Sequence, residues 1–156
     1  MSESSVIERL NAIGIKVPVA VTPVANYVPG VLATGPLLFL SGQGTREDGV
    51  FQYVGKVGED LSVEDGEAAA RLCAINILAQ VQAFCGFNAV KRVVKLTGFV
   101  NSAPDFVDVP KVLNGASDLM VQAFGEQGKH ARSAIGVTTL PFGMAVEVEA
   151  VFELYG

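Results

Sequence analysis

Apolar positions recur at intervals of three and four residues between Val63 and Phe84, the spacing that places side chains on one face of an α-helix. Ser62 stands before this run with acidic residues directly after it, as at a helix N-terminus, and Gly86 follows the run. The sequence therefore predicts a helix from Val63 to about Phe84. Its apolar stripe comprises Ala70, Cys73, Ile77, Val81 and Phe84.

Start and stop signals predict two further helices. Ser5 and Glu8 have the spacing of a capping box, so a short helix would run to about Asn11. Pro110 fits the first turn of a helix that reaches about Phe124, where glycines follow. No change in composition divides the chain. We therefore expect a single domain over residues 1–156, with residues 1–14 as an N-terminal helical extension.

Runs of β-branched and aliphatic residues predict the strands. The expected strands are 31–33, 37–40, 50–54, 90–100, 132–138 and 145–154. The first two flank Thr34-Gly35-Pro36 and form a hairpin, and the last two are expected to adjoin. The element order α-ββ-β-α-β-α-ββ predicts an α+β fold, in which two helices cover one face of a mixed sheet.

The composition limits the class of protein. Half of the residues are hydrophobic and 17% are charged, against about 25% charged in an average domain. This apolar content excludes disorder, and we expect part of it to lie in a subunit interface. The net charge of −5 argues against nucleic acid as a partner. With two cysteines and no apolar leader in MSESSVIERL, we expect a cytoplasmic protein without membrane contact.

Standard cofactor and metal motifs are not found in the sequence. Gly42-Gln43-Gly44 is a lone GxG that we interpret as turn glycines, and there is no phosphate-binding loop. Cys73 and Cys85 have no metal-ligand spacing and are interpreted as core thiols. His130, the single histidine, is interpreted as a loop residue before a strand. We therefore expect neither a metal nor an organic cofactor.

The last strand alternates strictly between apolar and acidic residues. Val146, Val148, Ala150 and Phe152 share one face, and Glu147, Glu149 and Glu153 share the other. These acids either form a solvated sheet face or line a cleft with a cationic partner. Arg132 is isolated in an apolar run, and its guanidinium is either in a structural ion pair or ready for a carboxylate or phosphate ligand.

Several segments in order resemble the Rid family (YjgF/YER057c/UK114), the reactive intermediate deaminases, also labelled endoribonuclease L-PSP. The resemblance extends from about Tyr27 to the C-terminus, and the chain is closest to a longer subgroup of the family. The matching segments are Tyr27-Val28-Pro29-Gly30, Leu40-Ser41-Gly42-Gln43, Gly98-Phe99-Val100-Asn101, His130-Ala131-Arg132-Ser133, Leu140-Pro141 and Val146-Glu147-Val148-Glu149-Ala150.

The resemblance implies a chorismate-mutase-like fold assembled as a homotrimer around a central β-barrel, with clefts between subunits. It implies hydrolysis of reactive 2-imino and 2-enamino acids to 2-keto acids and ammonia. Arg132 matches the arginine that binds the substrate carboxylate, and Glu147 the acid near the attacking water. Tyr27 and Ser41 match hydroxyl groups of the cleft, and Asn114 is a looser match to a cleft asparagine.

This chemistry agrees with the residue types. A bidentate arginine fixes a carboxylate, and a protonated imine carbon needs only an oriented water and a proton acceptor such as Glu147. We expect burial to raise the pKa of Glu147 and Arg132 to lower it. Archetypal deaminases often carry cysteine two residues after the arginine, where this chain has Ala134. A non-catalytic trimer that binds a small carboxylate is therefore the alternative, and an endoribonuclease ranks last.

Overall fold

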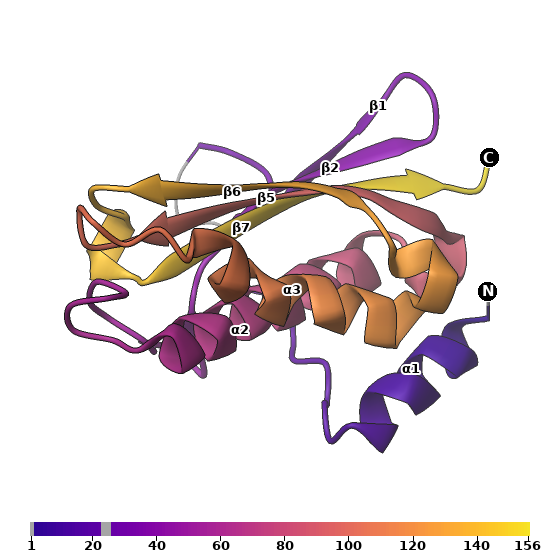
Figure 1. Ribbon diagram of the computed structural model, residues 1–156. Helices are drawn as coiled ribbons and strands as arrows, with labels where there is room; N and C mark the ends of the chain where they lie inside the picture. Colours follow the sequence, from indigo (N-terminus) through magenta and orange to yellow (C-terminus); the bar gives the residue numbers. More distant parts are fainter. Residues whose placement is uncertain (1, 23–25) are drawn as a thin grey trace.

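Five strands form one mixed sheet in the computed structural model, which describes residues 2–22 and 26–156. The strand order is β1-β2-β7-β5-β6, in which β5 and β6 are parallel and the other neighbours antiparallel (Figure 1). The strands are β1 Gly30–Ala33, β2 Leu37–Gln43, β5 Val90–Asn101, β6 Ala131–Val137 and β7 Val146–Leu154. A separate hairpin pairs β3 Arg46–Glu47 with β4 Val50–Phe51.

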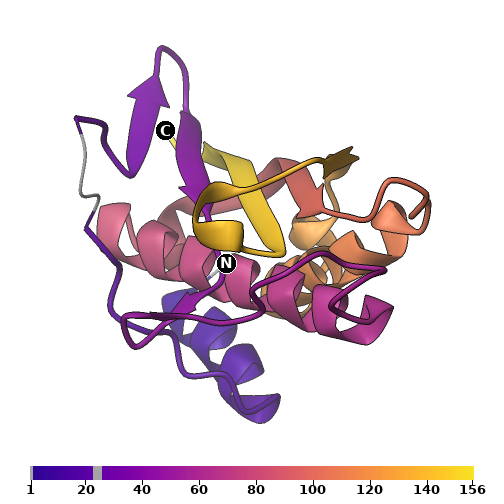
Figure 2. The same ribbon diagram turned by 90° about the vertical axis from the view of Figure 1, so that its left-hand side faces the viewer.

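Two helices, α2 Val63–Phe84 and α3 Val109–Phe124, lie side by side on one face of this sheet, and the other face is open (Figures 1 and 2). Helix α1 Glu3–Ala12 lies beside α3. The described residues also form three short 3-10 helices: η1 Phe87–Ala89, η2 Gly125–Gly128 and η3 Pro141–Gly143. The predicted α+β architecture is confirmed. No helix in the described part of the chain is long and apolar enough to cross a membrane.

The core lies between the sheet and α2 and α3, where the sequence pattern placed it. All four apolar residues of the alternating last strand are buried, as are Ala70, Cys73, Ile77 and Val81 of α2. Phe84, expected on the same stripe, is 44% exposed because it lies in the last turn of the helix, where no described residue covers it. The periodicity therefore predicted the buried face of both elements.

Helix α1 starts earlier than predicted. Ser2 caps it by accepting a hydrogen bond from the backbone N–H of Ser5, so the capping box expected at Ser5 is wrong. This start places Val6 and Leu10, one turn apart, in the core. The predicted strand 50–54 is also shorter, since β4 ends at Phe51 and Tyr53 takes a positive φ of 49° that breaks the strand.

The two C-terminal strands do not adjoin as expected. Strand β5 lies between them, parallel to β6 and antiparallel to β7. Leu96 of β5 pairs with Arg132, and Phe99 pairs with Glu147. The sheet therefore separates Arg132 from Glu147 by a full strand.

Candidate functional site

Glu147 projects from the open face of β7 and leans over the end of β2. Gly42 makes this possible, because a Cβ there would overlap the Glu147 carboxylate. A Cβ at Gly44 would overlap Met144 in the same way. A β-bulge between Leu40 and Gln43 places the two glycines at this crossing. The prediction that the GxG segment is a turn is therefore wrong. It is a place where side chains approach the backbone closely.

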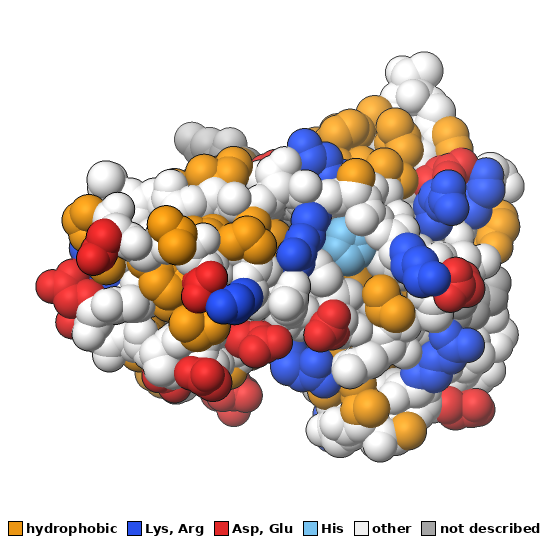
Figure 3. All heavy atoms as spheres, in the orientation of Figure 1, with side chains coloured by type: hydrophobic (Ala, Val, Ile, Leu, Met, Phe, Trp, Pro, Cys, Tyr) orange, Lys and Arg blue, Asp and Glu red, His pale blue; other side chains and the backbone are white. Residues whose placement is uncertain are grey.

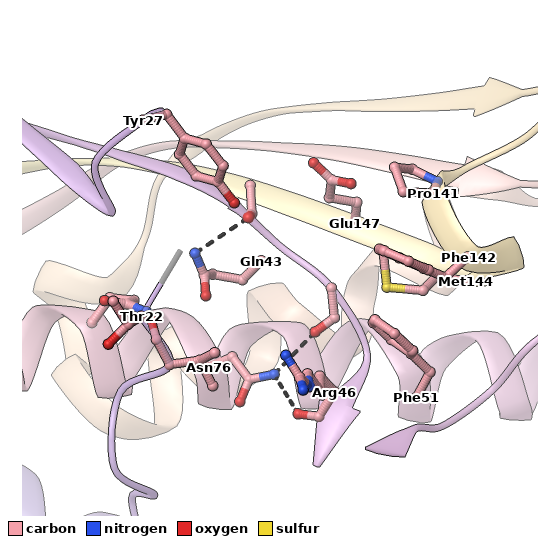
Figure 4. Close-up of a pocket in the computed structure, with 14 residues that line it drawn as sticks. Thr22, Tyr27, Gln43, Arg46, Phe51, Asn76, Pro141, Phe142, Met144 and Glu147 are labelled. Atoms are coloured by element: carbon pink, nitrogen blue, oxygen red, sulfur yellow. Dashed lines mark hydrogen bonds between the residues drawn. The ribbon is translucent and has the colours of Figure 1, made fainter. Parts of the chain in front are cut away.

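Glu147 lines a cavity of about 270 Å³ together with Tyr27, Arg46 and Phe142. Figure 4 shows Tyr27 and Glu147 on one side of this cavity, and Arg46, Phe51 and Asn76 on the side of α2. Phe142 stacks on Phe51 with ring centres 4.6 Å apart. We call this space the Glu147 pocket. It brings together two of the residues that the sequence predicted as catalytic, Tyr27 and Glu147.

The Glu147 carboxyl group is half-buried, and its pKa is raised. Burial is the larger cause, because it penalises the charged form, and the nearby charge of Glu149 adds to it. Within one chain Arg132 does not lower this pKa, contrary to the prediction, because Arg132 lies beyond β5. A raised pKa moves a carboxylate toward the range in which it can both accept and return a proton near neutrality.

Arg132 points to the helix side of the edge strand β6 and forms a second cluster with α3. Its Nη1 donates to Asn114 Oδ1 at 3.0 Å and to Ser117 Oγ at 3.1 Å. Its Nη2 donates to the carbonyl oxygen of Pro110 at 3.2 Å. These acceptors are all neutral, and no ion pair among the described residues involves Arg132. The sequence left open whether Arg132 forms a structural ion pair or is ready for an anionic ligand. The structure of the chain favours the second, because the guanidinium is held in place but not neutralised.

Ser117 and His130 join this cluster and were not predicted from the sequence. His130 Nδ1 lies 2.6 Å from the Gly128 carbonyl oxygen and therefore donates to it, which leaves Nε2, 3.1 Å from Ser117 Oγ, as an acceptor. Burial lowers the pKa of His130, and Arg132 lowers it further, against the effect of the Gly128 hydrogen bond. A neutral histidine thus orients the Ser117 hydroxyl, whose oxygen accepts from Arg132. The available signal was the i, i+2 spacing of Arg132 and His130, which lies directly before β6, because extended backbone directs residues two apart to the same side.

Ser41 lies outside the Glu147 pocket. It borders a separate depression on the open face with Lys95, Thr97 and Glu149. Its Oγ donates to the Val28 carbonyl oxygen at 2.7 Å and so fixes the segment that carries Tyr27. The five predicted residues thus fall into three places in one chain. Tyr27 and Glu147 lie in the pocket, Arg132 contacts Asn114 on α3, and Ser41 lies on β2.

Comparison with known proteins assigns the chain to a family. The family described as "YjgF/chorismate mutase-like, putative endoribonuclease" matches residues 7–154. Protein TCP17 of Trypanosoma cruzi is 47% identical, with 99% of this chain and 97% of that protein covered. A crystal structure of a protein of unknown function from Agrobacterium tumefaciens is 44% identical and superposes with a TM-score of 0.92, covering 98% of this chain and 94% of that one. RidA from an Antarctic Psychrobacter is 25% identical with a TM-score of 0.59, covering 86% and 93%.

Proposed function

Since the chain belongs to the YjgF/chorismate mutase-like family, we propose that it hydrolyses reactive 2-imino and 2-enamino acids to 2-keto acids and ammonia. The observation that carries this proposal is the division of the site into two incomplete halves. Arg132 has only neutral partners, and Glu147 lies in a cavity with a raised pKa and no arginine from β6 beside it. A cleft between two copies of the chain would complete both halves.

The proposed assembly is a homotrimer in which the open sheet faces form a central barrel. The described chain leaves apolar side chains uncovered on this side, with Val31 55%, Phe39 46% and Ile135 42% exposed. Figure 3 shows hydrophobic side chains gathered over the β1–β2 hairpin. Burial of this surface against sister chains would offset its cost in water. Light scattering is expected to give the mass of three subunits at micromolar protein, and a monomer would contradict the interface cleft.

In the proposed reaction, Arg132 binds the substrate carboxylate through its guanidinium fork, and Asn114 and Ser117 hold that fork in place. Glu147 accepts a proton from a water molecule while the oxygen of that water attacks the protonated imine carbon. That proton then passes to the amino group of the resulting carbinolamine. The C–N bond breaks as the hydroxyl group gives up its proton to Glu147 and the carbonyl of the 2-keto acid forms, and Glu147 passes this second proton to the departing ammonia, which leaves as ammonium. The Tyr27 hydroxyl lies where it can orient the water. These steps need no metal or organic cofactor.

A direct assay tests the activity. 2-Iminobutyrate is generated in situ by an amino acid oxidase. Its rate of hydrolysis is measured with the wild-type protein and with Glu147→Gln and Arg132→Ala. We expect hydrolysis above the uncatalysed rate that both substitutions remove. No acceleration by correctly assembled wild-type protein would contradict the proposal.

One observation favours a second function, a non-catalytic trimer that holds a small carboxylate. Ala134, packed against the core on β6, supplies no thiol two residues after Arg132. Calorimetry with 2-oxobutyrate separates the two functions, because binding that depends on Arg132 without any turnover would establish the second. RNA cleavage ranks below both, because the net charge of −5 opposes a polyanionic substrate. This order would be reversed if protein cleared of contaminating nuclease degraded RNA and Arg132→Ala abolished that activity.

A further inference from the structure

Arg46 is a charged side chain in the Glu147 pocket that has no role in the proposed reaction. Its Nε is buried and has no hydrogen-bond partner among the described residues. None of the ion pairs found in the described part of the chain involves it. A guanidinium stays charged at every physiological pH, and a buried donor without an acceptor is costly. The pocket therefore has an unsatisfied positive group at the end away from Glu147.

The local fold holds Arg46 in this position. It is the cross-strand partner of Phe51 in the β3–β4 hairpin, whose Asp48-Gly49 turn has positive φ at both central residues. Its Cζ lies 5.6 Å from the centre of the Phe51 ring. Asn76 of α2 donates to the backbone carbonyl oxygens of Gly44 and Arg46, at 3.0 Å and 2.9 Å. Because backbone and side chain are both restrained, little freedom remains to be lost when a ligand binds.

The walls of the pocket indicate what such a ligand looks like. Phe51 and Phe142 form an apolar wall, and Phe142 is 72% exposed although it adopts a positive φ of 58°. Strained and exposed aromatic residues are characteristic of ligand sites. The cavity volume of about 270 Å³ is near the lower limit of about 300 Å³ for small-molecule sites, which suits an acid of roughly ten non-hydrogen atoms.

We propose that Arg46 forms a second anion subsite, which binds a carboxylate at the end of the substrate's side chain. The preferred substrates are then 2-imino acids with an acidic side chain rather than an aliphatic one. The apolar wall of Phe51 and Phe142 contacts the methylene groups between the two carboxylates. This inference rests on the proposed function only in placing the reacting carbon at Glu147, since the anion subsite itself depends on Arg46.

Binding of stable product analogues tests the subsite without requiring turnover. Calorimetry compares 2-oxoglutarate with 2-oxohexanoate, which has a similar length but no second carboxylate. We expect the wild-type protein to bind 2-oxoglutarate about tenfold or more tightly, the value of one charge-assisted contact. Arg46→Met should abolish this preference and leave 2-oxohexanoate binding unchanged. Arg46→Lys, which keeps the charge and loses the fork, should retain part of it. Arg92→Met, at an exposed arginine outside the pocket, is the control.

Equal affinity of the wild-type protein for the two acids would overturn the subsite. So would an equal loss of both in Arg46→Met, or a changed oligomeric mass, because either result assigns Arg46 a structural role. The proposed hydrolysis is tested separately with 2-iminobutyrate, which has no second carboxylate. A protein that hydrolyses 2-iminobutyrate but shows no preference in binding refutes the subsite alone. A protein with the Arg46-dependent preference that turns over neither 2-iminobutyrate nor 2-iminoglutarate refutes the hydrolysis alone.

Discussion

Arg132 and Glu147 project from opposite faces of one sheet, with β5 between their strands. Arg132 reaches α3 on the helix side, whereas Glu147 leans over β2 on the open side. One chain therefore does not present both side chains to the same small substrate. If both side chains act on one substrate, one of them comes from a second subunit. Arg132→Ala and Glu147→Gln should then complement each other in a mixed assembly.

Complementation is measured by refolding inactive Arg132→Ala together with inactive Glu147→Gln. In a cyclic trimer with each site shared by two chains, random mixing restores about a quarter of the sites. We therefore expect roughly a quarter of wild-type activity from a mixture of two inactive proteins. Refolding each variant alone is the control. A mixture that stays inactive after confirmed subunit exchange would place both residues in a site built by one chain.

Arg132→Ala is expected to remove carboxylate binding with little effect on folding. The guanidinium donates only to neutral acceptors at the surface, so its loss leaves no buried charge unpaired. Calorimetry with 2-oxobutyrate measures the binding, and thermal unfolding and light scattering measure stability and assembly. An unfolded or monomeric variant would show that Arg132 has a structural role instead.

Ser117→Ala tests whether the hydroxyl group positions Arg132. The substitution removes one hydrogen bond, worth about 0.5–1.5 kcal/mol, from the guanidinium and frees His130 Nε2. We expect KM for 2-iminobutyrate to rise roughly three- to tenfold, while kcat changes little because Glu147 is untouched. Ser117→Thr, which keeps a hydroxyl, should recover most of the affinity. A fall in kcat alone would contradict a positioning role.

The pH profile of hydrolysis should follow Glu147. The group accepts a proton, so the rate falls as the pH drops through its pKa. Burial and the charge of Glu149 raise that pKa from the ordinary value of a glutamate. Glu149→Gln removes the like charge and should shift the acid limb of kcat/KM to lower pH. Glu153→Gln, on the same strand face but paired with Lys91 at 2.6 Å, is the control and should leave the limb in place. An upward shift in Glu149→Gln would exclude Glu147 as the titrating group.

Local periodicity was sufficient to predict most of the elements. The alternation from Val146 to Phe152 and the stripe of α2 each identified a buried face, because neighbours along the chain determine which side chains share a face. The order of strands was not predictable in this way. Whether β5 lies between β6 and β7 depends on contacts across the whole sheet, and the sequence gives no local sign of it.

The candidate site shows the same limit. Resemblance identified Arg132, Asn114 and Glu147, and the structure places the first two in direct contact. Arg46 was not identified, although Asp48-Gly49 is a residue pair typical of two-residue hairpin turns. Counting outward from a two-residue turn pairs Arg46 with Phe51, so that contact was accessible from the sequence. Its position in the Glu147 pocket was not, because it depends on the packing of the hairpin against α2.

Gly42→Ala tests the placement of Glu147 with one added methyl group. The new Cβ would occupy the position of the Glu147 carboxylate, so that side chain must move away from the water it activates. We expect kcat to fall by about tenfold to a hundredfold, the cost of displacing a catalytic group by about 1 Å. The melting temperature should change little, because the nearest atoms belong to a side chain that can move and alanine also restricts the unfolded chain. Gly136→Ala on β6, where an added Cβ would lie 3.0 Å from Ser102 Oγ, is the control and should keep its activity. Full activity in Gly42→Ala would show that the observed position of Glu147 is not the one used in the reaction.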